Sequence, residues 1–213
     1  MPAKNAIKFY IPNSIYHIYN RGVNKDLIFK DEQDYKVFLN YLKECLSPVE
    51  DGSRFQVRNL KSFYTEIELL AFCLMPNHVH LLIKQKDKNS IKKFTKSLFT
   101  RYSMYFNKKY KREGPLFQGK YKAVNVMNKD YLLDISRYIH KNPLKFIKNL
   151  TDTYSSYAHY MGNINLSWVN KDIVLEYFKE STFMQYNNIK TYKYFVEEFK
   201  YRDENLDLTR SDS

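Results

Sequence analysis

The chain has 213 residues, of which 44% are hydrophobic, which suits one globular domain with an extension or at most two small domains. Its formal net charge of +12 favours polyanionic partners, nucleic acid first and acidic membrane second. The two cysteines lie in apolar runs, which disfavours a disulfide framework or a cysteine metal site. No apolar stretch resembles a signal peptide or could span a bilayer, so we expect a cytoplasmic protein without a membrane segment.

Hydrophobic periodicity predicts an ordered series of elements up to residue 142. They are strand 15–20, helix 31–46, strands 67–74 and 78–84, helix 90–109, strand 121–127 and a further helix that begins at residue 128 or 130 and ends near residue 141. The first six elements have the ferredoxin-like order, which predicts an α+β fold with an antiparallel sheet and two helices on one face. The helix after residue 128 and a C-terminal extension are added to this core. Polar loop is expected at 48–61, weak helices near 171–180 and 191–201, and a loose tail from Arg202.

A His-x-His pair begins the strand at 78–84. Residues two apart in a strand project from the same face, so His78 and His80 can reach one ion while Val79 points the other way. The motif alone is weak evidence, because two ordinary histidines with hydrogen-bond partners would give the same pattern. Neither an HExxH motif nor a Cys-x-x-Cys pair indicates a zinc hydrolase.

The helix that follows residue 128 carries a second set of reactive side chains. Tyr138 and Asn142 lie one turn apart on a single helical face. A phenol can form a covalent ester with phosphate, and a carboxamide oxygen can ligate a hard metal ion. The alternative for Asn142 is that it caps a short helix with Pro143 at its first position.

Several blocks of the sequence resemble the HUH single-tyrosine transposases, and most closely their REP-associated branch. The specific blocks are MPNHVHLL at 75–82 and YIHKNP at 138–143, supported by YHIYNRG at 16–22, GPLFQGKY at 114–121 and YSSY at 154–157. The match spans roughly residues 10–160, in order and with sensible spacing, whereas 161–213 match only loosely. The resemblance implies a catalytic domain at 1–150 and a partly helical C-terminal extension at 151–213.

The resemblance also implies a mechanism. His78 and His80 would be metal ligands, Tyr138 the nucleophile, and Asn142 the third ligand, where insertion-sequence relatives carry glutamine. With Mg²⁺ or Mn²⁺ as the ion, the chain would cleave hairpin-bearing single-stranded DNA and transfer the strand through a 5′-phosphotyrosine. The protein could be a monomer or a homodimer, and the C-terminal extension favours the monomer slightly.

Candidate DNA contacts come from the first strand, the basic helix and the block at 114–121. They are His17, Asn20, Arg21, Lys92, Lys93, Lys96, Arg101, Gln118 and Lys120. A buried histidine with hydrogen-bond partners is the alternative for His17, solvated turn residues for Asn20 and Arg21, and a solvated helix face for the basic residues. Two other functions stay open: a non-catalytic nucleic-acid-binding module, and a metal-dependent nuclease that activates water.

Overall fold

The computed structural model describes residues 10–48 and 61–199. Four strands make one sheet: β1 (Ile15–Arg21), β2 (Ile67–Met75), β3 (His78–Gln85) and β4 (Lys122–Val126). The helices are α1 (Glu32–Leu46), α3 (Ser90–Tyr110), α4 (Lys129–Lys141), α5 (Tyr157–Tyr160), α6 (Asp172–Glu180), α7 (Thr182–Tyr186) and α8 (Tyr192–Glu197), with 3₁₀ turns η1 (Val23–Lys25), η2 (Asn142–Lys145) and η3 (Leu150–Asp152). The polar loop at 49–60 and the tail from residue 202 lie outside the described residues.

The strand order is β2-β3-β1-β4, and every neighbouring pair is antiparallel. This is the ferredoxin-like arrangement, so the predicted fold class is confirmed. Helices α1 and α4 also begin where their polar caps predict: the side chains of Asp31 and Asn128 each accept a backbone N–H from the first turn of the helix. The short helices α5 and α7 were not predicted.

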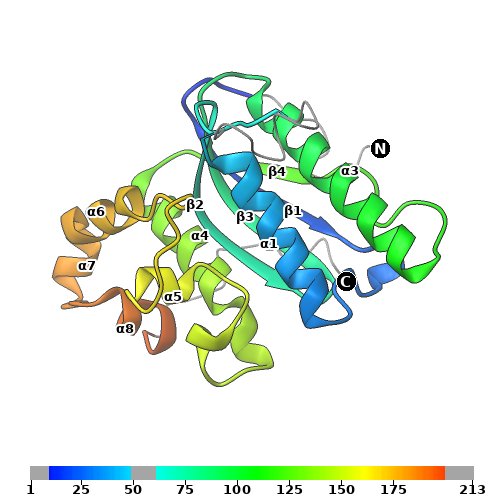
Figure 1. Cartoon of the computed structure of the whole chain (residues 1–213). Coiled ribbons are helices and arrows are strands. Elements are labelled where there is room, and N and C mark those ends of the chain that lie inside the picture. Colours follow the sequence, from blue (N-terminus) through cyan, green and yellow to red (C-terminus); the bar gives the residue numbers. More distant parts are fainter. Residues whose placement is uncertain (1–9, 49–60, 200–213) are drawn as a thin grey trace.

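Helices cover both faces of the sheet (Figure 1). On one face α1 and α3 pack on alternate strand residues such as Ile18, Phe72 and Leu81. On the other face α4 and the C-terminal helices pack on Leu70, Cys73 and other residues of opposite orientation. Because β2 and β3 are covered on both faces, they read in the sequence as nearly continuous apolar runs.

A two-residue turn, Pro76-Asn77, joins β2 to β3 and fixes where His78 begins. Gly22 donates its N–H to the Asn77 carbonyl at 2.8 Å, and the Asn77 amide donates to the Lys25 carbonyl at 3.1 Å. A Cβ on Gly22 would lie 2.2 Å from the Asp26 carbonyl oxygen, so only glycine fits this crossing. The end of β1 therefore braces the turn that presents the two histidines.

The C-terminal helices hold α4 through buried polar contacts. Arg137 donates to the carbonyls of Phe195 at 2.6 Å and Phe199 at 2.5 Å. His140 bonds the Tyr192 hydroxyl at 2.9 Å and the Ser156 hydroxyl at 2.7 Å. Residues 150–196 thus share one apolar core with α4, and the division into domains at residue 150 stays a prediction. Across 10–48 and 61–199, no helix is both long and apolar enough to cross a bilayer.

Candidate active site

The imidazoles of His78 and His80 project from the face of the sheet that α4 covers. Val79, between them, is buried on the opposite face under α1 and α3. The two rings lie perpendicular with their centroids 4.8 Å apart. The strand geometry predicted from the His-x-His spacing is therefore present in the structure.

Helix α4 brings the tyrosine and the asparagine to these imidazoles. The Tyr138 ring packs edge-on against His80 with centroids 5.4 Å apart, and Asn142 Nδ2 lies 3.1 Å from His80 Nε2. The backbone of Asn142 is helical, with φ −50° and ψ −41°, and its N–H bonds the Tyr138 carbonyl. The side chain of Asn142 therefore faces His80. The N-cap position of η2 belongs to Lys141, whose side chain makes no capping hydrogen bond there, so the capping interpretation of Asn142 is wrong.

Burial keeps the inner imidazole neutral. His80 is 4% exposed, and burial, followed by the nearby His78, His17 and Arg21, holds the pKa of His80 well below its usual value. A neutral imidazole has a lone pair to offer to a metal ion or to a hydrogen-bond donor. Across neutral pH His80 is thus in the protonation state that ligation needs.

The donor set suits a divalent cation that also takes oxygen from a phosphate and from water. Asn77 Oδ1 lies 2.6 Å from Nδ1 of His78, so a neighbouring side chain holds that nitrogen and Nε2 is the atom that would ligate an ion. The Asn142 carboxamide can turn about its last bond and present oxygen instead of nitrogen to an ion beside His80. No group of three or more His, Cys, Asp or Glu side chains able to hold an ion occurs within the described ranges. Two imidazoles and one amide would leave an ion with positions for oxygen ligands.

The comparisons with known proteins show the family and the fold of this chain. The family described as "Transposase IS200 like" matches residues 11–142. The chain belongs to the IS200-like transposase family. A solved REP-associated tyrosine transposase bound to a REP hairpin superposes with a TM-score of 0.52 at 13% identity, over 75% of this chain and 86% of that one. A provisionally assigned transposase from Deinococcus radiodurans R1 has a TM-score of 0.38 at 18% identity, over 65% and 95% of the two chains. No curated protein matches the sequence.

The side chains of β1 alternate between the two faces of the sheet. His17 and Arg21 share the face of the imidazoles, and Arg21 is paired with His78 across the ladder. His17 is only 1% exposed and bonds His80, so the predicted DNA contact at His17 is corrected: a side chain buried in this way cannot reach a nucleic acid. Asn20 points to the opposite face, where it lines a groove.

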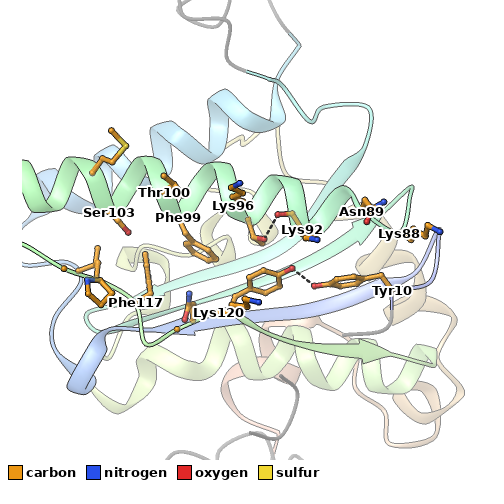
Figure 2. Close-up of a pocket in the computed structure, with 18 residues that line it drawn as sticks. Tyr10, Lys88, Asn89, Lys92, Lys96, Phe99, Thr100, Ser103, Phe117 and Lys120 are labelled. Carbon is orange, nitrogen blue, oxygen red and sulfur yellow. Dashed lines mark hydrogen bonds between the residues drawn. The ribbon is translucent and has the colours of Figure 1, made fainter. Parts of the chain in front are cut away.

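This groove, about 870 Å³ in volume, lies between α3 and the segment that leads into β4 (Figure 2). Lys92, Lys96 and Phe99 face it from α3, while Phe117 and Lys120 face it from the other side. The hydroxyls of Tyr10 and Tyr121 bond each other at 2.5 Å along its floor. Four of the predicted DNA contacts therefore meet in one basic, aromatic groove, on the face of the sheet away from Tyr138: Asn20, Lys92, Lys96 and Lys120.

Other predicted DNA contacts of the transposase lie outside the groove. Arg101 pairs with Glu44 and stacks over Tyr41 at 4.2 Å, so α3 uses this arginine to hold α1, and its assignment to DNA is corrected. Lys93 and Gln118 are exposed beside the groove, and their contacts with DNA stay predictions. Phe99 also lines the groove but was not among the predicted contacts. Its place could have been predicted from helical spacing, because the side chains at i, i+4, i+7 and i+11 share one face of α3: Lys92, Lys96, Phe99 and Ser103.

Proposed function

We propose that this transposase cleaves and rejoins single-stranded DNA through a covalent bond to Tyr138, with the help of a divalent metal ion. The observation that supports this most is the meeting of side chains from two elements: Tyr138 and Asn142 of α4 both reach His80 of β3. A nucleophile, a neutral imidazole and an amide thus lie together on one face. The proposed substrate is hairpin-bearing DNA, because the solved relative is described as bound to a REP hairpin.

In the proposed reaction the Tyr138 hydroxyl oxygen attacks the scissile phosphorus in line with the bond that breaks. The Tyr138 hydroxyl gives up its proton to water as the new phosphorus–oxygen bond forms. The phosphorus–O3′ bond breaks, its electron pair stays on the 3′ oxygen, and that oxygen takes up a proton from water. When bound, Mg²⁺ or Mn²⁺ supplies a positive charge that polarises a non-bridging phosphate oxygen. His78, His80 and Asn142 would hold the ion. Reversal of the step by another 3′-hydroxyl rejoins the strand, because the phosphotyrosine ester conserves the bond energy.

The test is to incubate the full chain with end-labelled single-stranded hairpin DNA and Mn²⁺. We expect a labelled protein species that survives denaturation, and its absence when EDTA replaces the ion. Binding without any cleavage would support the non-catalytic alternative. Cleavage without a covalent species would support a nuclease that uses water, and either result overturns the proposal.

We further propose that the groove beside α3 holds the bound DNA. Lys92, Lys96 and Lys120 would neutralise phosphates, and the aromatic side chains offer surfaces on which unpaired bases stack. Substitution of Lys92 and Lys96 by alanine is expected to weaken hairpin binding and to lower the slope of log K against log salt by about 0.7–0.9 per lysine. Binding is measured by fluorescence anisotropy in EDTA over a range of salt concentrations, so that cleavage does not interfere.

Lys93→Ala is the matched control, because Lys93 is exposed on the same helix but does not line the groove. Its salt slope is expected to stay near that of the unchanged protein. Equal losses in Lys93→Ala and in the groove variants would show that the helix acts only through its overall charge.

A further inference from the structure

His17 makes a buried contact with the inner imidazole of the candidate site. Its Nε2 lies 2.9 Å from Nδ1 of His80, and the two rings are nearly parallel with centroids 5.1 Å apart. His17 is 1% exposed and sits on β1, the strand beside β3. This contact occupies the side of the His80 ring that faces away from Asn142.

Ligation of an ion through Nε2 of His80 would fix where the proton of each ring lies. A neutral imidazole carries one N–H, and an imidazole nitrogen that ligates a metal or accepts an amide proton carries none. With Nε2 of His80 given to the ion, the proton of His80 would lie on Nδ1 and be donated to Nε2 of His17, 2.9 Å away. The proton of His17 must then lie on its own Nδ1, which is buried and has no hydrogen-bond partner within the described residues.

The buried Nδ1–H of His17 would destabilise the fold, and an apolar side chain at this position would not have this effect. A buried N–H without a partner destabilises a fold, and a leucine could occupy such a position in the sheet without this cost. His78 shows what the imidazole can provide, because its own Nδ1 is held by Asn77 Oδ1 at 2.6 Å. Both histidines of β3 therefore have Nδ1 engaged by a neighbouring side chain, so that each would ligate an ion through Nε2.

We propose that His17 is a positioning residue that accepts the Nδ1 proton of His80 and so fixes the tautomer and ring orientation that ligation requires. This proposal rests on the proposed function, in which His80 is a metal ligand. The contact with Nδ1 of His80 occupies Nε2 of His17, and no three such side chains in the part of the chain that the structure describes are placed to share an ion. His17 thus acts through His80 and does not bind the ion itself.

The test compares Mn²⁺ binding, by isothermal titration calorimetry without DNA, in the unchanged chain, His17→Leu and His17→Gln. Loss of the acceptor in His17→Leu is expected to weaken Mn²⁺ binding about 10- to 100-fold. His17→Gln places an amide oxygen near the former Nε2 and is expected to restore most of that affinity. His159→Leu is the control: it removes another buried histidine, 5% exposed, which accepts the Leu166 N–H at Nδ1 and lies against the Val169 carbonyl at Nε2, and it should bind Mn²⁺ normally.

A second measurement needs no variant. Long-range ¹H–¹⁵N spectra of the Mg²⁺-loaded chain should show His80 protonated at Nδ1 and His17 unprotonated at Nε2. The opposite tautomers, or Mn²⁺ affinity in His17→Leu equal to that of the unchanged chain, overturn the proposal for His17 alone. If the unchanged chain neither binds Mn²⁺ nor forms the covalent species, the proposed function fails, and the inference about His17 fails with it.

Discussion

Tyr138→Phe is expected to abolish the covalent DNA–protein species, with a loss of more than about 1,000-fold, because the substitution removes the proposed nucleophilic oxygen. The ring contacts of Tyr138 with His80 and His17 do not require the hydroxyl, so the fold and Mn²⁺ binding should be retained. The measurement is the yield of labelled protein after denaturing electrophoresis, together with anisotropy to show that hairpin binding is unchanged.

Tyr131→Phe is the matched control, because Tyr131 lies on the same helix two turns earlier and packs against the same core. Its adduct yield should equal that of the unchanged chain. A covalent species that persists in Tyr138→Phe would assign the nucleophile to another residue, and its persistence would contradict the mechanism proposed for α4.

Arg137→Met is expected to lower the free energy of unfolding by about 2–4 kcal/mol, because it leaves the Phe195 and Phe199 carbonyls without their guanidinium donor. These carbonyls lie at the end of α8, where a helix has no internal donors left and a cation is favourable. For a chain of this size the melting temperature should fall by about 5–15 °C. Urea denaturation followed by circular dichroism measures the change.

Lys129→Met provides the comparison on the same helix. The ion pair of Lys129 with Glu180 joins side chains that are 62% and 64% exposed, so its loss should change the stability by less than about 0.5 kcal/mol. If Arg137→Met destabilises the chain no more than Lys129→Met, the guanidinium does not anchor the C-terminal extension.

The fold could be predicted because its signals are local. Short apolar runs, the cap at Asp31 and the breaks between elements give the order of the first six elements, and that order has few ways to form a sheet. The His-x-His spacing likewise fixes the common face of His78 and His80 once the strand is known. These inferences needed no contact between distant residues.

The assignments that changed all depend on such distant contacts. Asn142 is followed by proline, which locally favours a cap, but the approach of His80 from a strand 62 residues earlier gives its side chain another partner. His17 was predicted to contact DNA, but its side chain is bonded to His80. Arg101 of α3 forms an ion pair with Glu44 of α1. The residues next to such a side chain in the sequence do not determine which buried group it will contact in the fold.

The anchoring of α4 affects how one protein molecule would complete a reaction. The helix that carries Tyr138 is tied to the extension through Arg137 and His140, and it is packed against the sheet on its other side. To reach the histidines of a second molecule, the helix would have to break these buried bonds and expose its apolar core. We therefore expect each polypeptide to use its own tyrosine with its own imidazoles, so that a single chain holds a complete reaction centre and gains none of its reacting groups by assembly.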